Sequence, residues 1–481
     1  MSGRKMNIPV VHVIGGGLSG CECALTLAAY GFKVNIYEKR PASGDEVFKT
    51  DNLCELVCSN SLGSVKPDTA PGILKAELEE LGSFVLRAAR AAAVPGGQAL
   101  CVDRDKFSQN IKNEISRFPN IEVIRKEILS FDDFGKSDLV VMASGPLTSA
   151  KLFESLSEKF KAELYFYDAV SPIIAADSID MAKAFWQNRY QRGTPDYLNI
   201  ALNKEEYLRF YEALIGAETV PSHENEKEIF FEGCMPIEEL ARRGTHTLRF
   251  GPMKPKGIID PQNPDKMPYA VLQLRTENNM HSAFNLVGFQ TKMKFGEQKR
   301  VFSMIPGLEN IKILRYGVIH KNNYIYSPGA VNFDLSLKNS ENIYVAGQLL
   351  GSEGYTEAIA TGKIAALNII LKYLVPAGFA GEYKTLKRSV IGAVKSEEFS
   401  AGEVNDKNIV SVLDLIEYEK TMAGSLVKYI TKSEVKPKKF VPMNSNFGII
   451  DMKIAGSREG FPEVSKSEIC KIKDFLAKIA G

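Results

Sequence analysis

The chain has 481 residues, of which 44% are hydrophobic and 25% are charged, and its formal net charge at pH 7 is +2. This composition is that of a globular protein of two or three domains and excludes a disordered or collagen-like chain. Because the net charge is small, a nucleic-acid partner would have to be held by a local basic surface.

The seven cysteines and the apolar segments indicate where the protein works. The first apolar run breaks at once into glycines, so no signal peptide is expected, and an odd number of cysteines then favours reduced cytoplasmic thiols. The most apolar later segment, residues 364–381, is interrupted by Asn368 and Lys372, so no membrane span is expected. We predict a soluble cytoplasmic protein.

The first organised unit lies near the N-terminus. Residues 10–14, VVHVI, predict a buried strand, and Gly15, Gly17 and Gly20 follow as G-x-G-x-x-G at the start of a predicted helix, residues 18–31. A second predicted strand, KVNIYEK, carries Glu38 near its end. The glycines let a pyrophosphate approach a helix N-terminus, and the acid accepts a hydrogen bond from a ribose hydroxyl. We therefore predict a dinucleotide site, rather than a glycine turn without a ligand.

Two later segments indicate which dinucleotide is bound. Residues 138–146, DLVVMASGP, predict a buried strand, and residues 342–370 predict a strand, a glycine turn and a long helix. A late return to the same sheet is typical of FAD-binding proteins, in which the late helix N-terminus faces the flavin ring. No second G-x-G-x-x-G lies between these segments, so a separate NAD(P)H-binding domain is not expected.

The expected fold class is α/β, with a Rossmann-like FAD-binding domain of the glutathione-reductase type interrupted by a smaller α/β domain. We place the FAD-binding domain at residues 9–154 and 326–481, and the insertion domain at residues 155–325. Residues 377–415 are charged and contain glycine and serine, which predicts an irregular insertion within the second part.

The predicted insertion domain contains one strongly basic stretch, residues 241–256. Such a run is usually a solvated surface, but its glycines and prolines and its closeness to Cys234 favour a phosphate-binding surface. The candidate RNA contacts are Arg242, Arg243, Arg249 and Lys254. Just upstream, residues 204–218 predict a helix whose aromatic stripe belongs to the core.

Three cysteines stand out by context. Cys234, in FFEGCMPIEEL, lies on a predicted turn between a glycine and a Met-Pro pair, where its sulfur is presented rather than packed. Cys54 and Cys58 are spaced C-x-x-x-C, so that on a helix both thiols would share a face. That spacing is one residue short of the pair in flavin disulfide reductases. Five scattered histidines and no C-x-x-C predict no metal site.

A series of motifs along the chain resembles one known family. In order they are VIGGGLSG, ELVCSNSL, VDRDKF, ASGPLTS, FYDAVSPI, EIFFEGCMPIEELARRG, LRFGPMKP, LVGFQTKMKFGEQKRV, IPGLENIKILRYGVIHKN and PMNSNFGI. Together they resemble the folate- and FAD-dependent tRNA uracil-5 methyltransferases of the TrmFO type. The resemblance covers residues 9–370 and resumes at residues 420–450.

The resemblance implies a reaction and a set of site residues. It implies FAD, methylenetetrahydrofolate as carbon donor, NAD(P)H as reductant and the T-loop uridine 54 of tRNA as substrate, with no obligate protein partner. It assigns Cys234 as the nucleophile that adds to uracil C6, and Cys58 as the base that takes the C5 proton. Arg242 and Arg243 would favour the Cys234 thiolate. The implied cofactor-binding residues are Gly15, Gly16, Gly17, Leu18, Ser19, Gly20, Glu38, Gly145, Gly347 and Tyr355.

The sequence departs from the family pattern in places, which bears on the RNA target. Ile200 and Ala201 stand where many members have Cys-Pro, residues 43–52 lack the usual histidines, and residues 377–415 form a longer insertion. These departures leave open a uridine of 23S ribosomal RNA as the target of the same chemistry. A small-molecule flavin reductase that uses Cys54 and Cys58 as a redox pair also stays open, as does a wobble-uridine-modifying flavoprotein.

Overall fold

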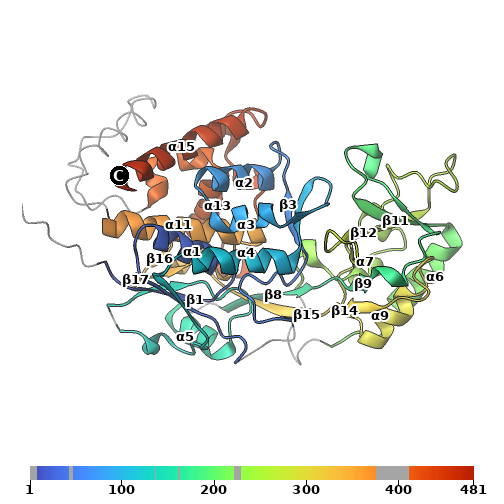
Figure 1. Cartoon of the computed structure of the whole chain (residues 1–481), viewed down its shortest axis with the longest axis horizontal. Coiled ribbons are helices and arrows are strands. Elements are labelled where there is room, and N and C mark those ends of the chain that lie inside the picture. Colours follow the sequence, from blue (N-terminus) through green and yellow to red (C-terminus); the bar gives the residue numbers. More distant parts are fainter. Residues whose placement is uncertain are drawn as a thin grey trace, which may run out of the picture.

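The computed structural model describes residues 8–42, 47–135, 137–160, 163–221, 229–374 and 411–480. The molecule has two lobes along its long axis (Figure 1). The larger lobe contains the N-terminal segment and the C-terminal helices, and the smaller lobe contains the middle of the chain. Strands β8 (Glu163–Ala169) and β15 (Ile319–Ile325) form an antiparallel ribbon between them.

The larger lobe is built on a six-stranded sheet in the order β16–β17–β7–β1–β2–β6. Its strands are β1 (Val11–Ile14), β2 (Val34–Tyr37), β6 (Ile121–Ile124), β7 (Leu139–Met142), β16 (Ser336–Leu337) and β17 (Ser340–Val345). All neighbours in this sheet pair in parallel except β16 and β17. Because β17 pairs with β7, the predicted late return of the chain to the first sheet is confirmed.

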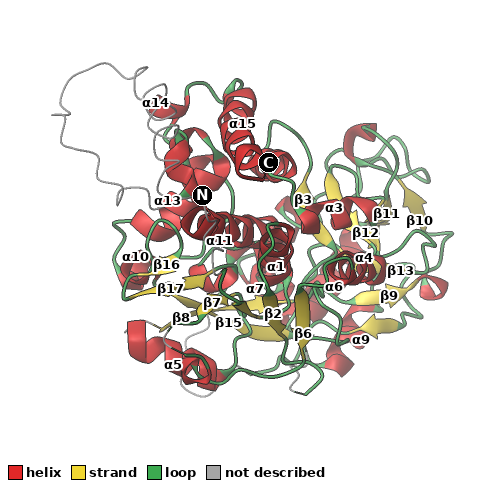
Figure 2. Cartoon of the chain, turned by 60° about the vertical axis from the view of Figure 1, so that its left-hand side comes forward, coloured by secondary structure: helices red, strands yellow, loops and turns green. Residues whose placement is uncertain are grey.

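Two helices cover one face of this sheet (Figures 1 and 2). Helix α1 (Leu18–Ala29) follows the glycine turn, and helix α11 (Tyr355–Leu374) follows β17. They pack backbone against backbone, because a Cβ at Gly362 would lie 2.3 Å from the Ser19 carbonyl oxygen. This close contact brings the N-terminal ends of both helices to the same edge of the sheet.

The C-terminal helices pack on the outside of the larger lobe. The remaining elements of this lobe are β3 (Ser61–Ser64), α2 (Ala70–Glu80), α3 (Phe84–Ala91), β4 (Ala93–Val94), β5 (Ala99–Val102), α4 (Arg104–Ser116), α5 (Ala150–Phe160), α10 (Ser327–Ala330), α13 (Met422–Lys432), α14 (Met452–Ala455) and α15 (Phe461–Ala480). The buried Glu77 carboxylate of α2 accepts from the backbone N–H groups of Met422, at 2.6 Å, and Ala423, at 2.8 Å. It also accepts from the Ser465 hydroxyl, so one side chain holds α13 and α15 on α2.

The smaller lobe has its own antiparallel sheet, in the order β10–β11–β12–β13–β9–β14. Its elements are β9 (Ile173–Ala175), β10 (Ala184–Trp186), β11 (Tyr197–Leu202), α6 (Lys204–Ile215), α7 (Ile237–Arg242), α8 (Thr247–Phe250), β12 (Ala270–Thr276), β13 (Ala283–Leu286), α9 (Phe295–Phe302) and β14 (Ile313–Arg315). Tyr207, Phe210 and Leu214 of α6 are fully buried in a core that the residues of this lobe form among themselves. The aromatic stripe is therefore core, as the sequence predicts.

The ends of the predicted insertion domain fall on defined elements. Residue 155 lies inside α5, where Leu156 is buried in the core of the larger lobe, and residue 325 is the last residue of β15. Of the predicted insertion at residues 377–415, the part up to residue 410 lies outside the described residues. Residues 412–415 form a short 3₁₀ helix with buried apolar side chains. In the described segments of the chain, no helix is long and apolar enough to span a bilayer.

Candidate active site

A cavity of about 1010 Å³, open to solvent, lies where β1, β2, β7 and β17 end. It is lined by Ile14, Gly15, Gly16, Gly17, Leu18, Ser19, Glu38, Lys39, Arg40, Glu55, Val57, Ser144, Gly145, Pro146, Thr148, Gly347, Gln348 and Tyr355, among others. All the predicted cofactor-binding residues except Gly20 are among them. Ligands of open parallel sheets bind at this carboxyl edge, and an anion is stabilised there by a helix N-terminus.

The glycines of the turn have different roles. Gly15 has φ +107°, and a Cβ there would lie 2.4 Å from the Ala143 carbonyl oxygen. A Cβ at Gly20 would lie 1.9 Å from the Gly15 carbonyl oxygen, so Gly20 lets α1 pack on the turn and does not contact the cavity. A Cβ at Gly17 would meet no atom of the described chain within 4 Å. Gly17 therefore leaves a space that a bound group can occupy.

Glu38 stands at the end of β2, at the rim of this cavity. Its Oε2 accepts from the Gly16 N–H at 3.1 Å, and its Oε1 accepts from Arg40 Nε at 2.8 Å. Burial raises the pKa of this carboxyl, but the Arg40 guanidinium more than offsets burial and holds the pKa below its usual value. Glu38 is thus an ionised acceptor that also braces the glycine turn. Arg40, which also pairs with Glu55 at 3.0 Å, was not foreseen from the sequence.

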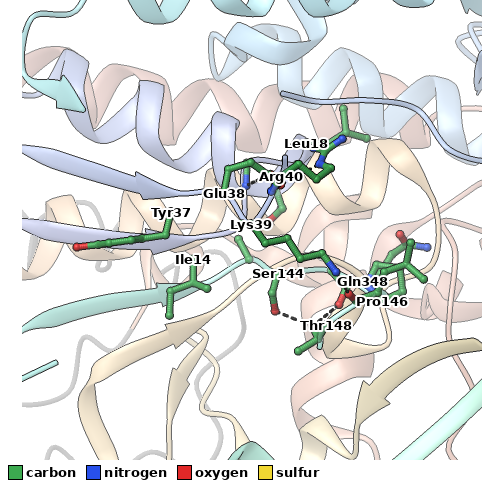
Figure 3. Close-up of a pocket in the computed structure, with 18 of the residues that line it drawn as sticks. Ile14, Leu18, Tyr37, Glu38, Lys39, Arg40, Ser144, Pro146, Thr148 and Gln348 are labelled. Carbon is green, nitrogen blue, oxygen red and sulfur yellow. Dashed lines mark hydrogen bonds and ion pairs between the residues drawn. The ribbon is translucent and has the colours of Figure 1, made fainter. Parts of the chain in front are cut away.

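The opposite side of the cavity is formed by the residues after β7 (Figure 3). Lys39 Nζ donates to the Leu147 carbonyl oxygen at 3.1 Å, and the hydroxyls of Ser144 and Thr148 lie 2.7 Å apart. The N-terminus of α1, the empty space beside Gly17 and the ionised Glu38 together fit a dinucleotide such as FAD. The residues present would hold its pyrophosphate at the turn and its ribose at Glu38.

Two cysteines from different parts of the chain meet beside this cavity. The Cys58 backbone N–H donates to the Tyr355 hydroxyl at 2.9 Å, and both Tyr355 and Val57 line the cavity. Cys234 ends a short 3₁₀ turn, residues 232–234, in which its N–H donates to the Phe231 carbonyl at 3.0 Å. The two thiols lie close enough together for each to change the pKa of the other. The structure thus brings the two predicted catalytic residues together.

The two thiols have opposite electrostatic surroundings. The neighbouring Cys234 thiol lowers the pKa of Cys58, and its effect outweighs burial with the help of the nearby Arg104 guanidinium. The Cys58 thiol, burial and the Asp168 carboxyl raise the pKa of Cys234 well above its usual value. Cys58 is therefore the more acidic thiol of the pair.

The expected source of positive charge is wrong. The sequence suggested that Arg242 and Arg243 favour the thiolate, but they pair with Glu239 at 2.5 Å and with Glu232 at 2.8 Å. The cations that act on the thiol pair are Arg104, at the start of α4, and Arg315, at the end of β14. Both are far from Cys58 in the sequence, and although both stand in quoted motifs, nothing in those motifs placed them beside the thiols.

Cys54 does not pair with Cys58. The segment from residue 51 to residue 60 is not helical, and Cys54 has φ +53° with its N–H donating to the Gly16 carbonyl at 2.9 Å. Its thiol is buried beside that of Cys21, which in turn donates to the Gly16 carbonyl. A shared helix face for Cys54 and Cys58 is thus wrong, which removes the geometric basis for a redox pair.

The predicted RNA contacts lie in the smaller lobe. Arg242 and Arg243 are at the end of α7, and Lys254 is exposed. Arg249 lies 3.7 Å above the Tyr269 ring and lines a groove of about 2100 Å³. Further cations line this groove, and the sequence did not single them out because they are scattered along the chain: Lys183, Lys204, Arg209 and Lys266.

The parallel sheet, the glycine turn and the late helix at the cavity define a Rossmann-like protein of the flavoprotein class. A family model described as glucose inhibited division protein A matches residues 10–375. The Fusobacterium nucleatum subsp. nucleatum protein named methylenetetrahydrofolate--tRNA-(uracil-5-)-methyltransferase TrmFO is 44% identical over 470 residues, covering 97% of this chain and 98% of that protein. A Dictyoglomus thermophilum protein of the same name is 45% identical over 441 residues, covering 92% of this chain and 91% of that protein.

A solved structure of Aquifex aeolicus GidA shares the fold, with a TM-score of 0.61 at 13% identity, covering 99% of this chain and 76% of that chain. The form I crystal of that protein gives a TM-score of 0.59 at 15% identity, over 97% of this chain and 78% of that one. This chain belongs to the GidA family and, within it, to the TrmFO group.

Proposed function

We propose that this protein methylates C5 of a uridine in RNA, with methylenetetrahydrofolate as the carbon donor. The proposed target is the T-loop uridine 54 of tRNA. The proposed reductant is FAD held in the cavity and reduced by NAD(P)H. The observation that carries the proposal is the Cys58–Cys234 pair, which lies beside a cavity that fits a dinucleotide.

The chemistry explains why two thiols are needed there. Uracil C5 is a poor nucleophile until a group adds to C6, and a cysteine sulfur is suited to that addition. C5 then captures a one-carbon unit at the formaldehyde level, and its proton has to be removed by a base. Cys234 is the proposed nucleophile and Cys58 the proposed base, and the lowered pKa of Cys58 favours the deprotonated form that a base needs. FAD, when bound, supplies the hydride that completes the methyl group.

The cofactor would be held by residues of both parts of the larger lobe. The turn from Gly15 to Ser19 would take the pyrophosphate, Glu38 a ribose hydroxyl, and the start of α11 at Tyr355 the region of the ring. Tyr355 also holds the backbone of Cys58. Cofactor binding and the position of the proposed base are therefore linked through one side chain.

For the RNA we propose the basic face of the smaller lobe, with Arg242, Arg243, Arg249 and Lys254 as phosphate contacts. Arg242 and Arg243 are ion-paired at the surface, and such pairs contribute little and exchange readily for phosphate. The groove at Arg249 offers further cations and the half-buried ring of Tyr269. A target uridine stacked in a loop would have to be extruded to reach the thiols.

The experiment supplies the purified protein with labelled methylenetetrahydrofolate, NAD(P)H and either tRNA or a 23S ribosomal RNA fragment, and then locates the modified base. Label at C5 of the T-loop uridine of tRNA supports the proposal. Label only in the ribosomal RNA would assign the same chemistry to that second target. No label in either RNA, with reduced flavin present, would overturn the proposal.

A further inference from the structure

One buried carboxyl beside the thiol pair has no part in the chemistry described so far. Asp168 lies near the end of β8, opposite His320 of β15, and is 3% exposed. Its Oδ2 accepts from Asn322 Nδ2 at 2.8 Å, and Asn322 Oδ1 lies 2.8 Å from His320 Nδ1. Its Oδ1 is buried and receives no N–H or O–H hydrogen bond from the described residues. The Cys58 and Cys234 thiols lie close enough to this carboxyl to act on its pKa.

The backbone fixes this contact. The Tyr167 N–H donates to the Ile229 carbonyl at 2.6 Å, and Tyr167 forms a parallel bridge with Phe230. The rings of Phe166 and Phe231 pack with their centroids 5.9 Å apart. The segment that carries Cys234 is therefore aligned along β8. Asp168 is the residue of β8 that follows this bridge, so the main-chain contact places the segment leading to Cys234 beside the strand that carries Asp168.

The proposed reaction releases two protons at this point, one from the Cys234 thiol and one from uracil C5. A single base that accepts the first proton cannot accept the second until it has lost the first. Burial and the nearby Cys58 raise the pKa of Asp168 to about 8, far above the usual pKa of a carboxyl. The Asp168 carboxylate is therefore a stronger base than an exposed carboxylate, and the pocket holds two acceptors for two protons.

We propose that Asp168 takes the Cys234 proton as the sulfur adds to uracil C6, which leaves Cys58 free to take the C5 proton. The S–H bond breaks, an O–H bond forms on Asp168, and the sulfur electron pair forms the S–C6 bond. When the S–C6 bond breaks at the end of the cycle, Asp168 returns the same proton to the sulfur. This assignment rests on the proposed function and adds a catalytic residue to it.

The surroundings of Asp168 define its pH dependence. The ionisable groups that surround Asp168 are Cys58, Cys234, His320 and Glu353. Arg104 and Arg315 affect it indirectly, because they lower the pKa of Cys58. Asp168 acts as a base only when it is ionised. The rate of addition at C6 should therefore rise with pH and level off above the pKa of Asp168. Loss of the Asn322 hydrogen bond, which stabilises the carboxylate, should move that midpoint upward.

The test measures the rate at which the holoenzyme forms a covalent adduct with an RNA that carries 5-fluorouridine at the target, from about pH 6 to about pH 10. Asp168→Asn should slow adduct formation by roughly 100-fold or more at neutral pH. The rate of adduct formation in this variant should also keep rising with pH instead of reaching a plateau. In Asn322→Ala the rate should still reach a plateau, but at a higher pH than in the wild type. Asp334→Asn, which removes another buried carboxyl that accepts from Ser336, is the matched control and should behave like the wild type.

The outcomes separate this inference from the proposed function. No adduct with the wild-type protein would refute the proposed function itself. A wild-type adduct that Asp168→Asn forms at the same rate and with the same pH profile would overturn the role of Asp168 alone. If Asp168→Asn does not fold, an unshifted midpoint in Asn322→Ala overturns the role as well.

Discussion

The space at Gly17 gives a prediction that separates the cofactor site from the fold. Gly17 precedes α1 with φ −82° and ψ −170°, an extended conformation that any residue adopts. A Cβ at this position meets no atom of the described chain within 4 Å, although the residue lines the cavity. Gly17→Val should therefore fold, and its side chain should stand where the pyrophosphate binds.

The expected magnitude follows from overpacking. Forcing extra methyl groups into a filled site costs about 1–3 kcal/mol. Because each 1.4 kcal/mol is a factor of ten in affinity, FAD should bind roughly 5- to 150-fold more weakly. The apoprotein should change little, since a side chain at a glycine position of compatible backbone shifts stability by only about 1 kcal/mol.

Gly20→Val is the matched control. Its Cβ would lie 1.9 Å from the Gly15 carbonyl oxygen, so the contact between α1 and the turn cannot form without a shift of the backbone. Both glycines lie in the same motif, but only Gly20→Val should destabilise the apoprotein. The assay combines the flavin absorbance retained after gel filtration with the thermal unfolding of cofactor-free protein. Full flavin occupancy in Gly17→Val would refute the placement of the pyrophosphate.

Three further predictions test the RNA surface, the thiols and the C-terminal helices. Changing Arg242 and Arg243 together to Glu should weaken RNA binding and reduce its salt slope by roughly 1.5–2, while NAD(P)H still reduces the flavin; an unchanged slope would make these residues a solvated surface. Cys234→Ala should lose both methylation and the 5-fluorouridine adduct, whereas Cys58→Ala should lose methylation and keep the adduct, and the opposite result would exchange their roles. Burial raises the pKa of Glu77 to about 7, so its protonated form stabilises the fold. This contribution is fully present below the pKa that Glu77 has in the unfolded chain, and it is lost as the pH rises through about 7. Between about pH 5 and about pH 8 the wild type should lose about 3 kcal/mol more unfolding free energy than Glu77→Gln, as thermal melts would measure, and equal losses would contradict this.

The sequence alone determined the features that depend on local spacing. The strand, glycine turn, helix and Glu38 occur in one stretch of chain, so their order predicts the cavity edge on which they meet. The late strand and helix carry the same kind of local signal. The turn at Cys234 follows from its neighbours, because glycine allows the backbone to turn and proline fixes the backbone that follows.

Only the tertiary structure decided which groups act on the two thiols. The ribbon of β8 and β15 places Asp168 at Cys234, and the folded larger lobe places Arg104 at Cys58. Arg242, a neighbour of Cys234 in the sequence, instead pairs with Glu239 one turn away on its own helix. Residues that are distant in sequence meet only when the sheets and helices have packed. Spacing along the chain therefore cannot reveal the charges that set the pKa of a buried thiol.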